Sequence, residues 1–132
     1  MCNCEAKNTR LNTLFTVMDG LMSEYEREIR QKYEDDKALE HLNDQMEDIE
    51  NNTKLIVANE KDDIGMNKFS NDEARKSAVY AILRDHKGYQ ALREEKIRLL
   101  LELEPRKIRL DVLVRRMRQQ EFNKELESMR KD

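Results

Sequence analysis

The chain has few of the residues that make tight turns and thick cores. Among its 132 residues are three Gly, one Pro and no Trp, and aromatic residues make up 5%, whereas Asp, Glu, Lys and Arg make up 40%. This composition is typical of long helices that share a narrow buried seam. It argues against a globule with a thick core and predicts one all-α domain over residues 1–132.

Long apolar runs are also absent. No stretch of about 18 apolar residues exists, so we expect no membrane-spanning helix and no membrane partner. The N-terminal residues lack the apolar segment of a secretory signal. The only cysteines are Cys2 and Cys4, which favours a reducing, cytoplasmic setting. Two thiols fall short of the four ligands of a structural zinc ion. A metal shared between subunits is therefore the weaker interpretation, and we expect no cofactor.

A seven-residue apolar repeat runs through the first half of the chain. Residues 1–8 are expected to be disordered, and residues 9–58 are expected to form one helix, capped by Asn8 or Thr9. The a positions of the repeat are Leu11, Met18, Tyr25, Lys32, Leu39, Met46 and Thr53. The d positions are Leu14, Leu21, Glu28, Asp35, Leu42, Ile49 and Ile56. The repeat predicts a coiled coil, in which the charged seam residues require partners.

The second half continues this repeat after a break. Residues 59–70 are rich in charge and contain Gly65, which predicts a turn. A second helix is expected over 71–130, capped by Ser70 with Glu73 three residues later. Its a positions are Ile82, Tyr89, Lys96, Leu103, Leu110 and Met117. Its d positions are Ala78, Asp85, Leu92, Leu99, Arg106 and Leu113.

Pro105 lies within this second helix. Proline lacks an amide hydrogen, and its ring collides with the carbonyl of Leu101. Either the helix kinks there, or it ends near Leu103 and a third helix starts at Pro105. The seam keeps one heptad phase across the proline, which favours a continuous, kinked helix.

The two repeats together predict a long antiparallel two-helix coiled-coil hairpin. A turn centred near residue 65 brings together residues whose numbers add to about 130. Lys96 then lies near Asp35, and Arg106 lies near Glu28, so opposite charges meet in the seam. Buried pairs of this kind set alignment more than they add stability.

Apolar residues also continue beside the seam, at the e positions of the repeat. These residues are Phe15, Met22, Ile29, Leu100 and Val114. A lone hairpin would leave them in water. We therefore expect the hairpin to associate into a helical bundle, most simply as a homodimer of four helices.

Charge is distributed unevenly along the chain. Residues 1–63 hold 8 Lys and Arg against 16 Asp and Glu, whereas residues 64–132 hold 17 against 12. The stretch 106–118 is the most basic, and its candidate contacts to nucleic acid are Lys107, Arg109, Arg115 and Arg118. In the antiparallel register, however, this stretch lies beside an acidic part of the first helix. The stretch is therefore more simply interpreted as the counterpart of that helix, and nucleic-acid contact is the weaker interpretation.

One stretch of the chain resembles a known group of proteins. The run Lys68-Phe69-Ser70-Asn71-Asp72-Glu73-Ala74-Arg75-Lys76, followed by Gly88-Tyr89-Gln90-Ala91-Leu92, resembles small helical-hairpin proteins encoded among phage early genes for recombination and replication. The resemblance covers roughly residues 66–122. It implies a non-enzymatic accessory to DNA transactions or to defence against host nucleases, and it carries over no functional residue.

The expected function is that of a non-catalytic coiled-coil interaction protein, not an enzyme. Its expected partners are a second copy of itself and a protein of DNA metabolism or host defence. The first alternative is direct nucleic-acid binding through the basic stretch 106–118. The second alternative is inhibition of a host nuclease or defence protein through an acidic face of the first helix.

Overall fold

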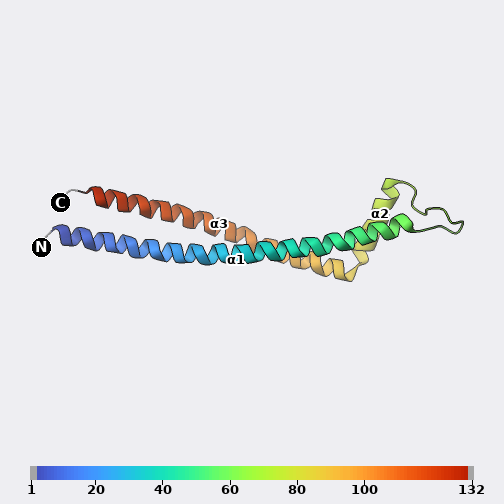
Figure 1. Ribbon diagram of the computed structural model, residues 1–132, viewed down its shortest axis with the longest axis horizontal. Coiled ribbons are helices and arrows are strands. Elements are labelled where there is room, and N and C mark those ends of the chain that lie inside the picture. Colours follow the sequence, from blue (N-terminus) through green and yellow to red (C-terminus); the bar gives the residue numbers. More distant parts are fainter. Residues whose placement is uncertain (1–2, 131–132) are drawn as a thin grey trace. The chain divides into compact units, whose positions relative to one another are not determined.

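The computed structural model describes residues 3–130, which form three α-helices: α1 (Asn3–Asn59), α2 (Asp72–Asp85) and α3 (Lys87–Met129) (Figure 1). No β-strand occurs within these residues, where extended backbone pairs as an isolated bridge between Lys61 and Asn67. The expected all-α class is therefore confirmed. In the same part of the chain, no helix combines the length and the apolar character needed to cross a membrane.

Helix α1 starts earlier than the repeat predicts. It begins at Asn3, so the prediction of disorder over residues 1–8 is wrong for residues 3–8. Glu5 lies in its first turn, where a carboxylate interacts favourably with the helix dipole. Thr9 does not cap the helix, because its hydroxyl donates back to the carbonyl of Glu5 inside it. Cys4 is exposed, and Cys2 lies outside the described residues.

The loop between α1 and α2 is a defined turn, as predicted. Asp62 Oδ1 accepts hydrogen bonds from the amides of Ile64, at 3.1 Å, and Met66, at 2.9 Å. Gly65 has a φ of 83°, which glycine adopts without steric strain. Asn71, rather than the predicted Ser70, caps α2, because its Oδ1 accepts the amide of Ala74 at 2.7 Å. The side chain of asparagine at this position satisfies one of the free amides at the helix start.

The single helix predicted over 71–130 is divided at His86. The backbone of His86 is extended, with φ −78° and ψ 106°, and its amide donates to the carbonyl of Leu83. Its Nδ1 accepts the amide of Tyr89 at 2.8 Å, so one residue ends α2 and caps α3. A Cβ at Gly88 would lie 3.1 Å from the imidazole, so glycine leaves room for this cap. Helix α3 then continues through Pro105, and it does not end at Leu103.

The chain forms two compact units. Unit 1 holds the residues up to Glu34 and those from Glu102 onward, and so contains the first part of α1 and the last part of α3. Unit 2 holds Asp35–Leu101, which are the rest of α1, α2 and the start of α3.

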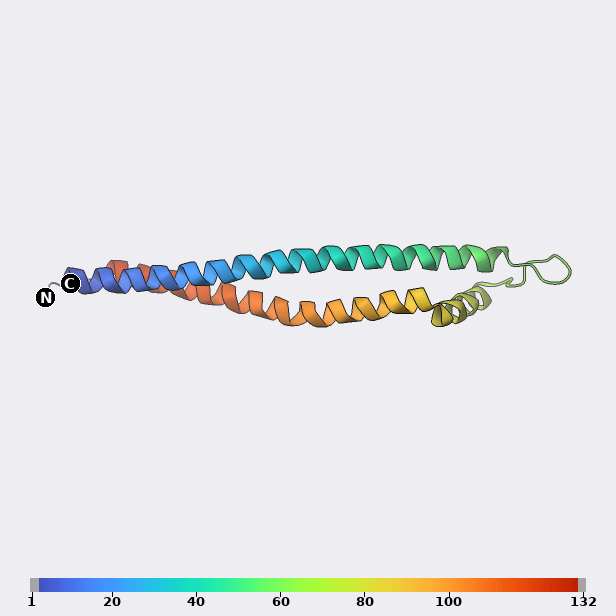
Figure 2. The same ribbon diagram turned by 90° about the horizontal axis from the view of Figure 1, so that it is seen from below.

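In unit 1, the parts of α1 and α3 lie side by side and run in opposite directions, as Figure 1 and Figure 2 both show. Arg10 contacts Glu127, and Glu28 contacts Arg106. The buried apolar residues all come from the predicted a and d positions. They are Met18, Leu103, Leu110 and Leu113. Their burial defines an inner seam between the two helices and stabilises unit 1.

In unit 2, the buried face of α1 drifts away from the heptad. The buried residues are Asp35, Leu42, Met46, Thr53, Val57 and Leu99. Ile56, at a predicted d position, is 62% exposed, whereas its neighbour Val57 is 1% exposed. A straight helix has 3.6 residues per turn, so its buried face moves by about 20° per heptad and reaches Val57.

Tyr89 joins the start of α3 to α1 within unit 2. Its hydroxyl donates to Glu50 Oε1 at 2.6 Å, and this hydrogen bond, with burial as the second cause, raises the pKa of Tyr89. The folded state therefore holds this proton more tightly than the unfolded state. The resulting stability is fully present below the unfolded pKa of about 10 and is lost as the pH rises through the higher folded pKa.

We expect one of the four tyrosines to ionise late in an alkaline titration followed by the ultraviolet absorbance of tyrosinate. Tyr89→Phe should remove that late step. Tyr80→Phe is the matched control, because the side chain of Tyr80 is exposed and the late step should survive its loss. A late step that survives in Tyr89→Phe would contradict the prediction.

Candidate interaction surface

One of the two charged pairs predicted from the seam is present. Arg106 Nη1 lies 2.7 Å from Glu28 Oε2, and both side chains are mostly buried, at 15% and 20% exposure. Arg109, a predicted nucleic-acid contact, has its Nε 3.5 Å from the same oxygen. This part of the basic stretch therefore faces the acidic helix within unit 1.

The other predicted pair, Asp35 with Lys96, is not among the ion pairs that the structure shows within residues 3–130. Asp35 is buried at 6% exposure, and Lys96 is half-buried. The register drifts along the helices, since the residue numbers add to 134 for Glu28 with Arg106 and to 139 for Glu50 with Tyr89.

The remaining basic candidates lie on the outside of α3. Lys107 Nζ is 3.3 Å from Glu104 Oε1 on the same helix. Arg115 and Arg118 are exposed. On the same face of α3, Ile108 and Val112 precede Arg115, and Phe122 follows it beyond Gln119.

These residues form a second apolar seam on α3 of unit 1, which we name the α3 outer stripe. Its members follow one another in alternating steps of three and four residues: Pro105, Ile108, Val112, Arg115, Gln119, Phe122, Leu126 and Met129. Counting about 100° per residue, the stripe lies about 160° round the helix from the inner seam. Ile108, Phe122, Leu126 and Met129 are between 52% and 77% exposed.

The last turns of α3 bury polar side chains while apolar ones stay outside. Lys124 Nζ lies 4.6 Å from the ring centre of Phe15, and Arg10 Nε donates to Glu127 Oε1 at 2.5 Å. This hydrogen bond holds the pKa of the Glu127 carboxyl below its usual range. Lys7 Nζ donates to the carbonyl of Arg130 at 2.9 Å. The apolar residues Leu126 and Met129 of this segment stay 52% and 77% exposed.

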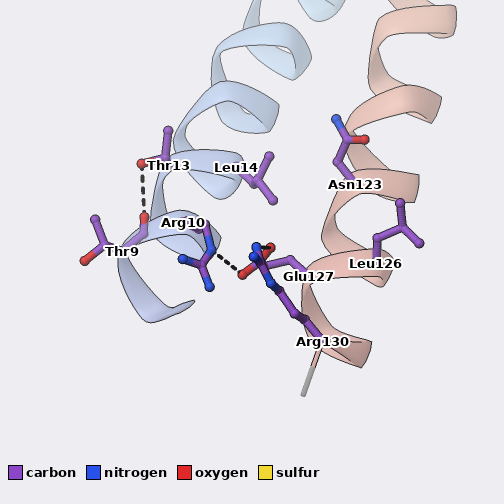
Figure 3. A pocket seen from close by; sticks show the side chains of 8 residues that line it. All are labelled: Thr9, Arg10, Thr13, Leu14, Asn123, Leu126, Glu127 and Arg130. Carbon is purple, nitrogen blue, oxygen red and sulfur yellow. Dashed lines mark hydrogen bonds and ion pairs between the residues drawn. The ribbon is translucent and has the colours of Figure 1, made fainter. Parts of the chain in front are cut away.

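Figure 3 shows that end of unit 1, where the two helices leave a hollow between them. The hollow is lined by Thr9, Arg10, Thr13, Leu14, Asn123, Leu126, Glu127 and Arg130. Arg10, Glu127 and Arg130 gather on one side of it, with the Arg10–Glu127 hydrogen bond drawn between the two helices. At this end the Arg10–Glu127 ion pair joins the two helices beside a hollow that Leu14 and Leu126 also line.

Helix α1 carries a matching stripe in unit 1, which we name the α1 outer stripe. Its members are Asn12, Phe15, Asp19, Met22, Glu26, Ile29 and Tyr33, again in steps of three and four residues. Phe15, Met22, Ile29 and Tyr33 are between 40% and 58% exposed. The e-position residues noted in the sequence thus belong to a longer stripe, in which acidic residues alternate with apolar ones.

Sequence reasoning predicted the edge of the α1 outer stripe but not the α3 outer stripe. The sequence does contain the pattern of the α3 outer stripe. Its apolar residues follow the same alternating steps of three and four residues as the inner seam of α3, two positions later in the chain. Comparisons with family models, curated proteins and solved structures gave no match to this chain. Within residues 3–130, no group of three or more His, Cys, Asp or Glu side chains is arranged to hold a metal ion.

Proposed function

We propose that this chain is a non-catalytic helical interaction protein that associates with itself through the outer faces of unit 1. The α3 outer stripe carries this proposal. Covering one Leu, Ile or Phe side chain stabilises an association by about 1.5–3 kcal/mol. Four such residues in register on one exposed helix face are typical of a surface that binds another helix.

The finer architecture that we propose is an antiparallel coiled-coil hairpin with a kink at Pro105. Opposed contacts in each unit support it, namely Arg10 with Glu127 in unit 1 and Glu50 with Tyr89 in unit 2. Pro105 supports the kink, because a proline inside a helix removes one hydrogen bond and displaces a carbonyl.

The biological setting that we propose is that of a phage-type accessory to DNA recombination or replication. The resemblance of residues 66–122 to such proteins supports it. A protein of DNA metabolism or host defence is then the further partner. The α3 outer stripe is the surface on which we would expect that partner to compete with self-association.

Replacing Phe122 and Leu126 together by serine should abolish or strongly weaken self-association. The change removes two of the most apolar members of the α3 outer stripe and keeps the buried residues Met18, Leu103, Leu110 and Leu113 of the inner seam. Sedimentation velocity from about 1 to 100 µM, with the association constant as readout, measures the effect. Val17→Ser is the matched control, because Val17 is exposed and lies outside both stripes. Equal association of the double variant and the wild type would contradict the proposal.

Nucleic-acid binding is the second candidate, and the exposure of Arg115 and Arg118 favours it. If both side chains bind phosphate, changing both to alanine should reduce the slope of log affinity against log salt by about 2. Titrations of fluorescent single- and double-stranded DNA at about 50 and 200 mM salt measure this slope. An unchanged slope would remove these arginines from the interface, and no binding at the lower salt would remove DNA as a partner.

A further inference from the structure

The two outer stripes of unit 1 are complementary to each other. We propose that the α3 outer stripe binds the α1 outer stripe of a second copy of this chain, with Arg115 facing Glu26. This inference rests on the proposed function. Each stripe alternates steps of three and four residues, which is the spacing that lets two helices pack knobs into holes. Each stripe also has a charged residue near its centre, basic on α3 and acidic on α1.

One antiparallel register matches three apolar pairs and one charged pair of the two stripes. When the numbers of facing residues add to 141, the facing apolar pairs are Tyr33 with Ile108, Ile29 with Val112, and Phe15 with Leu126. The same register sets Glu26 opposite Arg115. Asp19 then faces Phe122, and Arg118 lies one helical turn from Phe122 on α3, which places a second basic residue near this second acid.

The neighbouring registers lose these matches. A sum of 134 sets Phe15 against Gln119 and Glu26 against Ile108. A sum of 148 sets Ile29 against Gln119 and Glu26 against Phe122. Among the stripe members, the sum of 134 keeps two facing apolar pairs and the sum of 148 keeps one, against three at 141. The sum of 134 pairs Arg115 with Asp19 instead of Glu26, whereas the sum of 148 leaves Arg115 opposite Tyr33, without an acidic partner in a desolvated contact.

The α1 outer stripe must come from another molecule. Within one copy, α1 packs on the inner seam of α3, where Glu28 binds Arg106. The α3 outer stripe lies about 160° round the helix from that seam, so α1 of the same copy leaves most of it uncovered, although Leu126 also lines the hollow between the two helices. A second copy supplies the same sequence, and both outer stripes are exposed in the described structure of unit 1.

Two copies joined in this way do not close into a ring. The α1 outer stripe lies about 100° round its helix from the inner seam, and the α3 outer stripe about 160°. Because the helices are antiparallel, the rotation from the inner seam to the outer stripe has the same sense on α1 and on α3 when unit 1 is viewed from one end. A closed ring of four helices needs these two rotations to have opposite senses. The contact is therefore heterologous, and each added copy exposes a new stripe, so association continues past the dimer.

Charge reversal at the two central residues tests the contact. Glu26→Arg sets the new arginine opposite Arg115, and Arg115→Glu sets the new glutamate opposite Glu26. Like charges across an interface oppose binding, so each variant should weaken self-association by tenfold or more. The double variant, and an equimolar mixture of the single variants, should recover the wild-type association. Glu34→Arg is the matched control, because Glu34 is exposed and lies outside both stripes. Sedimentation equilibrium gives the mass, and circular dichroism checks that each variant keeps its helices.

The outcomes separate this inference from the proposed function. A wild-type mass that rises past twice 15.8 kDa, with loss in each single variant and recovery on swapping, is the expected result. Association that stops at a dimer, or that ignores both charge reversals, would overturn the inference while leaving self-association intact. A wild type that stays monomeric to about 100 µM would overturn the proposed function as well.

Discussion

Replacing Leu103 by alanine should lower the free energy of unfolding by about 3 kcal/mol. Leu103 is 2% exposed and belongs to the inner seam of unit 1. Truncation removes its transfer free energy and leaves a cavity that two helices joined by one narrow seam can fill only partly. Urea unfolding followed by circular dichroism, at one fixed protein concentration, measures the loss, because association also contributes to stability.

Leu101→Ala provides the control for this prediction. Leu101 lies two residues earlier on the same helix and is 71% exposed, so its truncation should change the free energy of unfolding by less than about 0.5 kcal/mol. Equal losses at the two positions would mean that the inner seam does not bury Leu103. A larger loss at Leu101 would place the stabilising contact on the outside of α3.

Replacing Arg106 by alanine should lower the free energy of unfolding by about 2–3 kcal/mol, because it leaves Glu28 mostly buried without its strongest partner. The effect should lie below that of a fully buried pair, since both side chains keep some exposure and Arg109 Nε remains 3.5 Å from Glu28. A double-mutant cycle with Glu28→Ala should give a coupling energy of about 1–2 kcal/mol.

The matched cycle uses Glu104 and Lys107, which form an exposed pair three residues apart on α3. Exposed pairs of this kind contribute about 0.2–0.5 kcal/mol, so its coupling energy should be several times smaller. Coupling between Glu28 and Arg106 as small as that of the exposed pair would show that their contact does not set the alignment of α1 with α3.

Much of unit 1 could be predicted because a repeat of seven residues determines which side chains share a helix face. Met18, Leu103, Leu110 and Leu113 were assigned to the seam on that ground, and all four are buried. A turn position estimated from residues 59–70 was enough to bring Arg106 close to Glu28, since an error of one turn still leaves long side chains within reach.

Unit 2 departs from the prediction where local hydrogen bonds decide the backbone. The break at His86 depends on an imidazole that caps α3 and on the absence of a side chain at Gly88, and neither belongs to a periodic pattern. Asn71 replaces Ser70 as the cap of α2 for a similar reason, because both residue types suit that role and only the local geometry selects one.

The α3 outer stripe was missed for a different reason. Once the inner seam had been assigned, Ile108, Phe122 and Met129 fell on the face of α3 that a hairpin turns to solvent, and isolated exposed apolar residues are common. Their regular spacing distinguishes them from such isolated residues. A helix with two apolar faces must be searched for a second period after the first has been found.

The contact between Arg10 and Glu127 also bears on how the chain folds during synthesis. These residues are 117 positions apart, whereas Glu50 and Tyr89 of unit 2 are separated by 39. Translation at about 5–20 residues per second makes residue 127 about 6–23 seconds after residue 10. The contacts of unit 2 can therefore form first, while the first part of α1 waits with its apolar residues uncovered. Until the last turns of α3 leave the ribosome, that segment is the part of the nascent chain most open to a chaperone or to a neighbouring nascent copy.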